Sequence, residues 1–245
     1  MLAIIGGTGA GQLADLQNTR RLVVRTPYGE PSGALTFGNL AGHEVVFIAR
    51  HGYGHTLPPH QINYRANLWA LAQQAPEGVI AIASVGGIRA DLAPGSLVIP
   101  DQILDYTYGR QHTMFESGHH PVTHIDFTEP YDNELRGRLL TAAKGLGINA
   151  INGGTYACTQ GPRLESAAEI RRIERDGGDM VGMTGMPEAA LAREAGLKYA
   201  TLAVVSNWAA GKDVSAHNVA FNLAGDAFQQ ALQHISALLG TLVRT

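Results

Sequence analysis

Residues 79–87 read Val-Ile-Ala-Ile-Ala-Ser-Val-Gly-Gly, a nearly continuous apolar run that ends in two glycines. A run of this kind, without alternation of polar and apolar positions, is typical of a strand that is covered on both faces. The same character recurs at residues 2–5, 45–49, 97–99 and 199–205, and we expect these to be strands of the same sheet. Strands covered on both faces occur mostly in parallel sheets flanked by helices, so the stretch predicts an α/β fold.

Helical patterns lie between these strands. The predicted helices cover residues 63–74, 135–144, 166–175 and 187–195, and a last one runs from Ala224 to Leu242, where apolar residues recur at spacings of three and four. Gly145, Gly177 and Gly196 are expected to end three of the helices. Residues 106–130 carry no such pattern and are predicted to form a long, functional loop. The alternation predicts one domain over residues 1–245, with a central mixed, mostly parallel sheet between two layers of helices.

Composition and charge exclude several classes of protein. The chain has 18 basic and 21 acidic residues and a formal net charge of −3, which excludes a strongly basic nucleic-acid binder. Its single cysteine, Cys158, excludes an intrachain disulfide. No apolar run approaches the ~18 residues of a membrane span, and the N-terminus is interpreted as a first strand rather than a signal peptide. We therefore expect a cytoplasmic protein with neither a nucleic acid nor a membrane as partner.

Three of the predicted strands end in residues that suit an anion. The first runs into Gly6-Gly7-Thr8-Gly9, the second into Arg50, and the run quoted above contains Ser84. Glycines let backbone N–H groups approach an anion, and an arginine after a buried strand needs an anionic partner. Ligands of open α/β sheets bind at the carboxyl ends of the strands. Gln12 breaks the dinucleotide fingerprint and no Walker sequence is present, so these motifs alone predict an α/β enzyme that handles a phosphate.

Each of these motifs also has a simpler interpretation. The first glycines suit a tight structural turn equally well, and Cys158 is expected to be a buried small side chain. His51 and His55 have the spacing of a zinc helix, but glycines lie between them and no carboxylate is near, so we expect histidines that form hydrogen bonds in a loop and no metal site. Glu165 could simply stabilise the start of the following helix.

Taken together and in order, the motifs resemble the trimeric purine nucleoside phosphorylase and methylthioadenosine phosphorylase family. The resemblance covers nearly the whole chain and rests on residues 4–9, 49–52, 63–67, 161–163 and 183–188 and on Asn207. It implies the three-layer fold of the nucleoside phosphorylases, a homotrimer and a phosphorolysis. In that reaction inorganic phosphate attacks the anomeric carbon of a purine nucleoside and releases the free purine and a ribose 1-phosphate. It also implies that phosphate is a co-substrate and that neither a metal nor an organic cofactor is needed.

The resemblance carries roles to particular positions. Phosphate would be held by Thr8, Arg50, His51, Ser84 and Thr184. Asn207, Arg50 and Thr184 would be the catalytic residues. Met183 matches the residue that packs against the ribose, and His124 matches a loop residue that reaches the active site of a neighbouring subunit. Ala83 stands where some methylthioadenosine enzymes have threonine, so one hydroxyl contact with phosphate is lost.

The positions of the base site point to a 6-oxopurine. Relatives specific for 6-aminopurines have aspartate at Asn207 and a second aspartate at Ala209, whereas 6-oxopurine enzymes have asparagine. An asparagine amide can donate to the 6-oxygen and accept from a protonated N7, while Glu165 can accept the ring N–H. Mispairing of such buried groups with adenine could cost about 10⁴–10⁵ in specificity.

The positions of the sugar site point to a 5′-methylthio group. Inosine–guanosine enzymes have a histidine that binds the 5′-hydroxyl, where this chain has Val219, with Leu223 one turn later and His217 nearby. The combination predicts 5′-methylthioinosine as the substrate. Three alternatives stay open: an inosine–guanosine phosphorylase, a methylthioadenosine phosphorylase with an unusual base site, and a nucleoside-binding protein without turnover.

Overall fold

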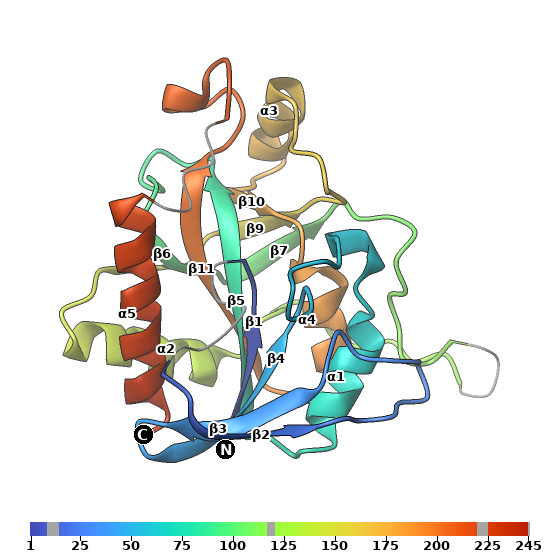
Figure 1. Cartoon of the computed structure of the whole chain (residues 1–245). Helices are drawn as coiled ribbons and strands as arrows, with labels where there is room; N and C mark the ends of the chain where they lie inside the picture. Colours follow the sequence, from blue (N-terminus) through green and yellow to red (C-terminus); the bar gives the residue numbers. More distant parts are fainter. Residues whose placement is uncertain (9–14, 117–120, 220–224, 245) are drawn as a thin grey trace.

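The structure is a computed structural model that describes residues 1–8, 15–116, 121–219 and 225–244. In these residues, eleven strands form one mixed sheet at the centre of the molecule (Figure 1). The strands are β1 Leu2–Gly6, β2 Gln17–Leu22, β3 Leu35–Leu40, β4 His43–Ala49, β5 Gly78–Gly87, β6 Leu97–Ile99, β7 Gln102–Asp105, β8 Ala150–Asn152, β9 Thr155–Cys158, β10 Met180–Gly182 and β11 Tyr199–Trp208. Their main order is β2-β3-β4-β1-β5-β10-β9-β7, and β11 branches off between β5 and β6, which in turn pairs with β8.

The five predicted strands are confirmed as β1, β4, β5, β6 and β11. Parallel pairing joins β1 to β4 and β5, β5 to β11, β9 to β7 and β10, and β6 to β8. The remaining pairs are antiparallel, among them the β2–β3–β4 meander at one edge. The fold class is therefore the predicted one, a mixed and mostly parallel sheet flanked by helices.

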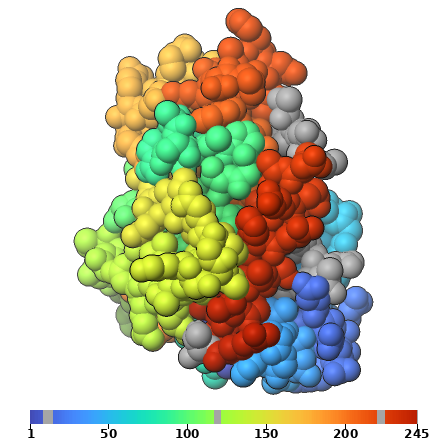
Figure 2. Space-filling view, turned by 90° about the vertical axis from the view of Figure 1, so that its left-hand side faces the viewer, coloured from blue at the N-terminus to red at the C-terminus, as the bar shows by residue number. Residues whose placement is uncertain are grey.

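Two layers of helices cover the sheet. The helices are α1 Tyr64–Ala72, α2 Asn133–Gly145, α3 Ala167–Arg175, α4 Gly185–Glu194 and α5 Asp226–Leu242, with short 3-10 turns at Pro59–Gln61 and Asp213–Ser215. Helices α1 and α4 pack on one face, and α2 and α5 lie side by side on the other (Figures 1 and 2). No helix in the described parts of the chain is long and apolar enough to cross a membrane.

Alternate residues of the central strands supply the two cores. Ile5 and Val79 belong to the hydrophobic cluster that includes α1 and α4, whereas Ile4 and Ile80 belong to the cluster that includes α2 and α5. Neighbouring residues of a strand point to opposite faces, so an unbroken apolar run is what a sheet covered on both faces requires.

The helix ends follow local chemistry, with one correction. Ser166 and Glu169 form a reciprocal capping box at the start of α3. Gly177 and Gly196 adopt positive φ after α3 and α4, as predicted. Helix α2 ends at Gly145 as expected, but Leu146 is its C-cap residue and Gly147, with a φ of 66°, is the glycine that turns the chain, so Gly145 does not have the predicted capping role.

A gap along one edge of β5 prepares the site. On that edge β5 pairs with β1 as far as Ala81 and with β10 from Gly86, so residues 82–85 lie between two different neighbours. The other edge pairs with β11 throughout this interval. A crevice therefore opens along β5, between the last residue that pairs with β1 and the first that pairs with β10. It lies on the side of the sheet to which the carboxyl ends of β1, β4 and β11 point. The predicted long loop, between β7 and α2, has neither helix nor strand in its described residues.

Candidate active site

A cavity of about 570 Å³ lies in this crevice. It is lined by residues that follow β1, β4 and β10, by residues near the end of β5 and β11, and by residues 162, 164 and 165 from the connection between β9 and α3. This volume is in the range of small-molecule sites, and the position is the one where open α/β sheets bind their ligands.

The cavity brings together ten of the twelve residues predicted from the sequence: Thr8, Arg50, His51, Ser84, Glu165, Met183, Thr184, Asn207, Ala209 and Val219. Ala83 also lines it. His124 is exposed in the loop between β7 and α2 and is not among the lining residues of this cavity. Leu223 lies outside the described residues. The individual roles of these residues stay predictions.

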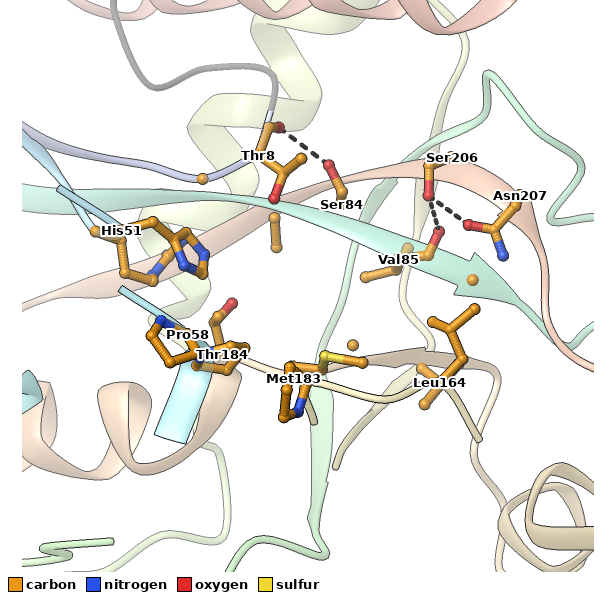
Figure 3. A pocket seen from close by; sticks show the side chains of 18 of the residues that line it. Thr8, His51, Pro58, Ser84, Val85, Leu164, Met183, Thr184, Ser206 and Asn207 are labelled. Carbon is orange, nitrogen blue, oxygen red and sulfur yellow. Dashed lines mark hydrogen bonds between the residues drawn. The ribbon is translucent and has the colours of Figure 1, made fainter. Parts of the chain in front are cut away.

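The residues predicted to hold phosphate gather at one end of the cavity. Figure 3 shows Thr8 and Ser84 on one wall, with His51 and Thr184 near the same end and Met183 next to Thr184. The Ser84 hydroxyl donates to the Thr8 carbonyl oxygen at 3.1 Å, which ties the turn after β1 to β5. Thr184 directly precedes α4, and its side chain caps no backbone N–H of that helix. Met186 has a φ of −120° and a ψ of 140°, so the regular part of α4 begins only after this residue.

Arg50 is paired with a buried carboxylate of the protein. The sequence had led us to expect an anionic ligand as its partner. Its guanidinium donates through Nε and Nη2 to the two carboxylate oxygens of Glu188, at 2.6 and 2.7 Å, and through Nη1 to the Ile82 carbonyl oxygen at 2.9 Å. Arg50 is 1% exposed and Glu188 is fully buried. Burial lowers the pKa of Arg50, but Glu188 more than offsets this and the pKa stays above its ordinary value. Arg50 therefore enters the site as a fixed fork whose charge is already paired.

Neighbouring groups hold this pair in place. The Tyr199 hydroxyl donates to a Glu188 oxygen at 2.8 Å. Gly7 passes so close that a Cβ there would lie 2.9 Å from Nη1 of Arg50 and 2.5 Å from the Ile82 oxygen. A glycine is thus required at residue 7 by the close approach of the guanidinium.

His51 is a neutral hydrogen-bonding group. Its Nδ1 donates to the Leu57 carbonyl oxygen at 2.8 Å, because a carbonyl oxygen can only accept. Burial, reinforced by the charge of Arg50, lowers the pKa of His51 from 6.5 to about 4. In this tautomer Nε2 is an acceptor, so the ring can bind a protonated phosphate oxygen but cannot act as a cation at neutral pH.

A bulge in β11 places Asn207 at the other end of the cavity. Val205 pairs with Val85 and Asn207 with Gly86, so Ser206 is an extra residue in the strand. Such a bulge re-aims the next side chain, and Figure 3 shows the Asn207 amide beside Ser206 and Val85. The Ser206 hydroxyl lies 2.7 Å from Asn207 Oδ1 and 3.2 Å from the Val85 carbonyl oxygen, and Asn207 Nδ2 donates to the Trp208 carbonyl oxygen at 2.8 Å.

These contacts fix which amide atom lies where. Trp208 offers only an acceptor, so the amide nitrogen must lie on that side and Oδ1 must face the Ser206 hydroxyl. One N–H of Nδ2 and one lone pair of Oδ1 remain for a ligand. Asn207 is 6% exposed, so these two groups are largely shielded from water.

Glu165 supplies a carboxylate acceptor to the lining of the same cavity. It accepts a hydrogen bond of 2.5 Å from the Thr159 hydroxyl, and burial raises the pKa of its carboxyl group. The capping box at the start of α3 is formed by Ser166 and Glu169, and the alternative that the charge of Glu165 stabilises this helix start stays a prediction. The side chain of Ala209, which is buried two residues after Asn207, provides no acceptor.

The middle of the cavity has an apolar character. Met183 lies between the two ends in Figure 3, with Leu164 toward Asn207 and Pro58 toward His51. Leu57, Pro59 and Val219 also line the cavity. The rings of His51 and His55 lie 4.4 Å apart, and no group of three or more metal-binding side chains comes together within the part of the chain that the structure describes.

Several groups with a function in the site escaped the sequence analysis. Glu188 was visible only as part of a motif, although a buried arginine implies an acid nearby, and Glu188 stands one position after the predicted start of a helix. Ser206 and the Trp208 carbonyl gave no signal, because a bulge and a backbone acceptor do not appear in a residue pattern. Arg110, in the long loop, was likewise missed.

The fold and the cavity define an α/β enzyme of the nucleoside phosphorylase type. The family model of the phosphorylase superfamily matches residues 1–244, and the chain belongs to this superfamily. It is 56% identical over 87% of its length to a protein of Pseudomonas syringae named probable S-methyl-5′-thioinosine phosphorylase, of which 87% is covered. It is 49% identical over 86% of its length to the 6-oxopurine nucleoside phosphorylase of Pyrococcus furiosus, of which 80% is covered.

A solved structure has the same fold. Methylthioadenosine phosphorylase from Schistosoma mansoni in complex with adenine superimposes with a TM-score of 0.93 at 31% sequence identity, covering 99% of this chain and 90% of the other. The chain is therefore a pentosyltransferase of the nucleoside phosphorylase fold, and the finer question is which nucleoside it uses.

Proposed function

We propose that the chain catalyses the phosphorolysis of S-methyl-5′-thioinosine to hypoxanthine and 5-methylthioribose 1-phosphate. The observation that carries the choice of base is the fixed amide of Asn207. Its free N–H can donate to the 6-oxygen of a purine, and its free Oδ1 lone pair can accept from a protonated N7. Glu165, when ionised, accepts the N–H of the adjacent ring nitrogen.

Adenine reverses two of these pairings. Its 6-amino group would meet the Asn207 N–H, and its ring nitrogen would present a lone pair to the Glu165 carboxylate. Because Asn207 is shielded from water, its amide could not turn to solvent instead, and mispaired buried groups carry large penalties. Two relatives support a 6-oxopurine, since their names specify thioinosine and 6-oxopurine nucleosides.

The sugar assignment rests on the apolar wall. Val219 offers no hydrogen bond to a 5′-hydroxyl and suits a methylthio group. An apolar pocket discriminates by only about 1–3 kcal/mol per small group, so inosine is the second candidate substrate. The name of the Pyrococcus relative supports this candidate, whereas that of the Pseudomonas relative supports the first.

The reaction needs no more than the groups around the cavity. A phosphate oxygen attacks the anomeric carbon, the glycosidic bond breaks, and its electron pair passes to the purine, where Asn207 stabilises the growing charge through the proton on N7. Arg50, Thr8, Ser84 and Thr184 would hold the phosphate with side-chain donors, and His51 with its Nε2 acceptor. We propose phosphate as co-substrate and no metal or organic cofactor.

We also propose that the active form is a cytoplasmic homotrimer. His124 is exposed and does not line the cavity of its own chain, which suits a residue that acts in a neighbouring subunit. The variant His124→Ala should lose activity while it keeps the oligomeric state of the wild type. Sedimentation of the purified protein measures that oligomeric state directly.

The test is base release from methylthioinosine, methylthioadenosine and inosine, each with and without phosphate. Phosphate-dependent release of hypoxanthine, fastest from methylthioinosine, is the expected result. Faster release from inosine would keep the base assignment and overturn the sugar assignment, and preference for methylthioadenosine would overturn the base assignment. Binding without release from any of them would favour a nucleoside-binding protein.

A further inference from the structure

Arg110 is a buried arginine in the long segment between β7 and α2. It is 9% exposed, and all three nitrogen atoms of its guanidinium donate hydrogen bonds. Nε donates to Gln160 Oε1 at 3.1 Å, and Nη2 to the carbonyl oxygens of Gln160 and Thr159 at 2.8 and 3.2 Å. Nη1 donates to the carbonyl oxygens of Met186 and Met183 at 2.6 and 2.9 Å and to the Tyr64 hydroxyl at 3.2 Å.

All six acceptors are uncharged oxygens, which distinguishes Arg110 from Arg50. A buried guanidinium is expensive unless its hydrogen bonds are complete, and here backbone carbonyl dipoles take the place of a carboxylate. The planar fork of an arginine holds five donors in a fixed geometry that spans acceptors on two sides, whereas a lysine ammonium is a compact point charge with three rotatable donors.

The four carbonyl groups belong to two segments that line the active site. Thr159 and Gln160 begin the segment that leads to Glu165, and the Thr159 hydroxyl itself donates to that carboxylate. Met183 and Met186 flank the turn with Thr184, where the sugar and phosphate are proposed to bind. The fork therefore joins a base-binding segment, residues 159–165, to a sugar-binding segment, residues 183–186.

The two segments also touch each other directly. Gly161 has a φ of 62°, and a Cβ there would lie 2.4 Å from Sδ of Met183. This contact fixes how closely the segments approach, and the hydrogen bonds of Arg110 fix how their backbones are oriented. Residues 159–165 belong to no helix or strand, so the orientation of the base-binding segment depends on such tertiary bonds.

We propose that Arg110 is a positioning residue that sets the base-binding segment relative to the sugar-binding segment. This proposal rests on the proposed function. The purine and the sugar of one nucleoside must be held in register for phosphate to attack the anomeric carbon. A displacement of about 1 Å between the two halves of a substrate can cost about 100-fold in rate.

The test compares Arg110→Met and Arg110→Lys with wild type and with Arg171→Met, an exposed arginine on α3 that serves as control. Nucleoside phosphorolysis is measured at saturating phosphate, and binding of hypoxanthine alone is measured by calorimetry. The nucleoside needs both segments in register, whereas the free base contacts one of them. We expect kcat/KM to fall about 100-fold in both variants, mostly through kcat, while hypoxanthine affinity and stoichiometry change by less than about threefold.

The outcomes separate positioning from other roles. Equal losses in kcat/KM and in hypoxanthine binding would overturn the proposal in favour of general structural support. Full activity of Arg110→Lys would also overturn it, because charge alone would then suffice. Wild-type protein that releases no base would refute the proposed function instead, a result distinct from any effect of the variants.

A milder variant keeps the test decisive if Arg110 variants fail to fold. Gln160→Leu removes the oxygen that accepts from Arg110 Nε and from the Tyr108 backbone N–H, and it leaves the five other hydrogen bonds of Arg110 in place. It should lower kcat about tenfold and leave hypoxanthine binding unchanged. Wild-type kcat in this variant, together with misfolding of the arginine variants, would overturn the proposal.

Discussion

Replacing Asn207 by Asp changes one atom of the site, and the structure predicts the consequence. In the native site Nδ2 lies 2.8 Å from the Trp208 carbonyl oxygen, and Oδ1 lies 2.7 Å from the Ser206 hydroxyl. A carboxylate oxygen in place of Nδ2 would face that carbonyl oxygen at hydrogen-bond distance with no proton between them. The new carboxyl group is therefore expected to take up a proton, which it donates to Trp208, and its pKa should lie above the ordinary value.

The variant thus loses the donor to the 6-oxygen and keeps an acceptor for N7–H. Loss of one such buried donor costs about 3 kcal/mol, or roughly a hundredfold in kcat/KM for methylthioinosine. Methylthioadenosine should gain less than about tenfold, because the Glu165 carboxylate still faces the lone pair of its ring nitrogen. The ratio between the two substrates should therefore shift by about 10²–10³ toward the aminopurine.

The assay is base release from both nucleosides at saturating phosphate, with Asn152→Asp, an exposed asparagine, as the matched control. Adding Glu165→Gln to Asn207→Asp should raise methylthioadenosine turnover further, since a Gln amide can donate to the ring lone pair. A substrate ratio that stays within about threefold of wild type in the single variant would refute the assigned base site.

Three further predictions concern Arg50, Glu165 and His51. Arg50→Met should lower the free energy of unfolding in urea by about 3–5 kcal/mol, because it leaves Glu188 buried and unpaired, and the double variant Arg50→Met/Glu188→Gln should regain much of this stability. Both variants should use phosphate poorly, and a normal phosphate KM in either would contradict the role of Arg50. Because burial raises the pKa of Glu165, hypoxanthine affinity should fall on acidification at a higher pH than an ordinary glutamate would produce, and Glu165→Gln should abolish this pH dependence in calorimetric titrations. The pKa of His51 is about 4 in the folded state and 6.5 when exposed, so its contribution to stability is complete above pH 6.5 and is lost toward pH 4, by up to about 3 kcal/mol. In urea unfolding, the stability of His51→Gln should depend less on pH between 4 and 6.5 than that of the wild type, and an unchanged pH dependence would contradict the buried neutral ring.

The parts of the fold that could be predicted are those whose signal is local. The strands β1, β4, β5, β6 and β11 are buried on both faces and appear as apolar runs. Strand β2 was missed because all six of its residues are exposed and polar side chains dominate it. Strands β8 and β10 have three residues each, as β6 does, but they end in an asparagine and a glycine rather than forming an apolar run, and they depend on pairing with distant neighbours.

The same distinction holds in the site. Thr8, Arg50 and Ser84 follow or end apolar runs, so their convergence follows from parallel strands alone. Asn207 and Glu165 were assigned through the family resemblance, and the structure adds the hydrogen bonds that orient them. Glu188 was not assigned a role because the interaction joins β4 to α4 across 138 residues, a separation that no local pattern reports.

The pairing of Arg50 with Glu188 determines how the site can bind an anion. The guanidinium charge is balanced before phosphate arrives, His51 is neutral, and Glu165 adds a negative charge at the base end. Net attraction is therefore small, and binding must come from directed donors: the hydroxyls of Thr8, Ser84 and Thr184 and the remaining guanidinium N–H groups. Directed donors bind one geometry, whereas net positive charge attracts any anion. A nearly neutral site of this kind should hold phosphate where the anomeric carbon can be attacked and should release the sugar phosphate, whose charge gains little from staying bound.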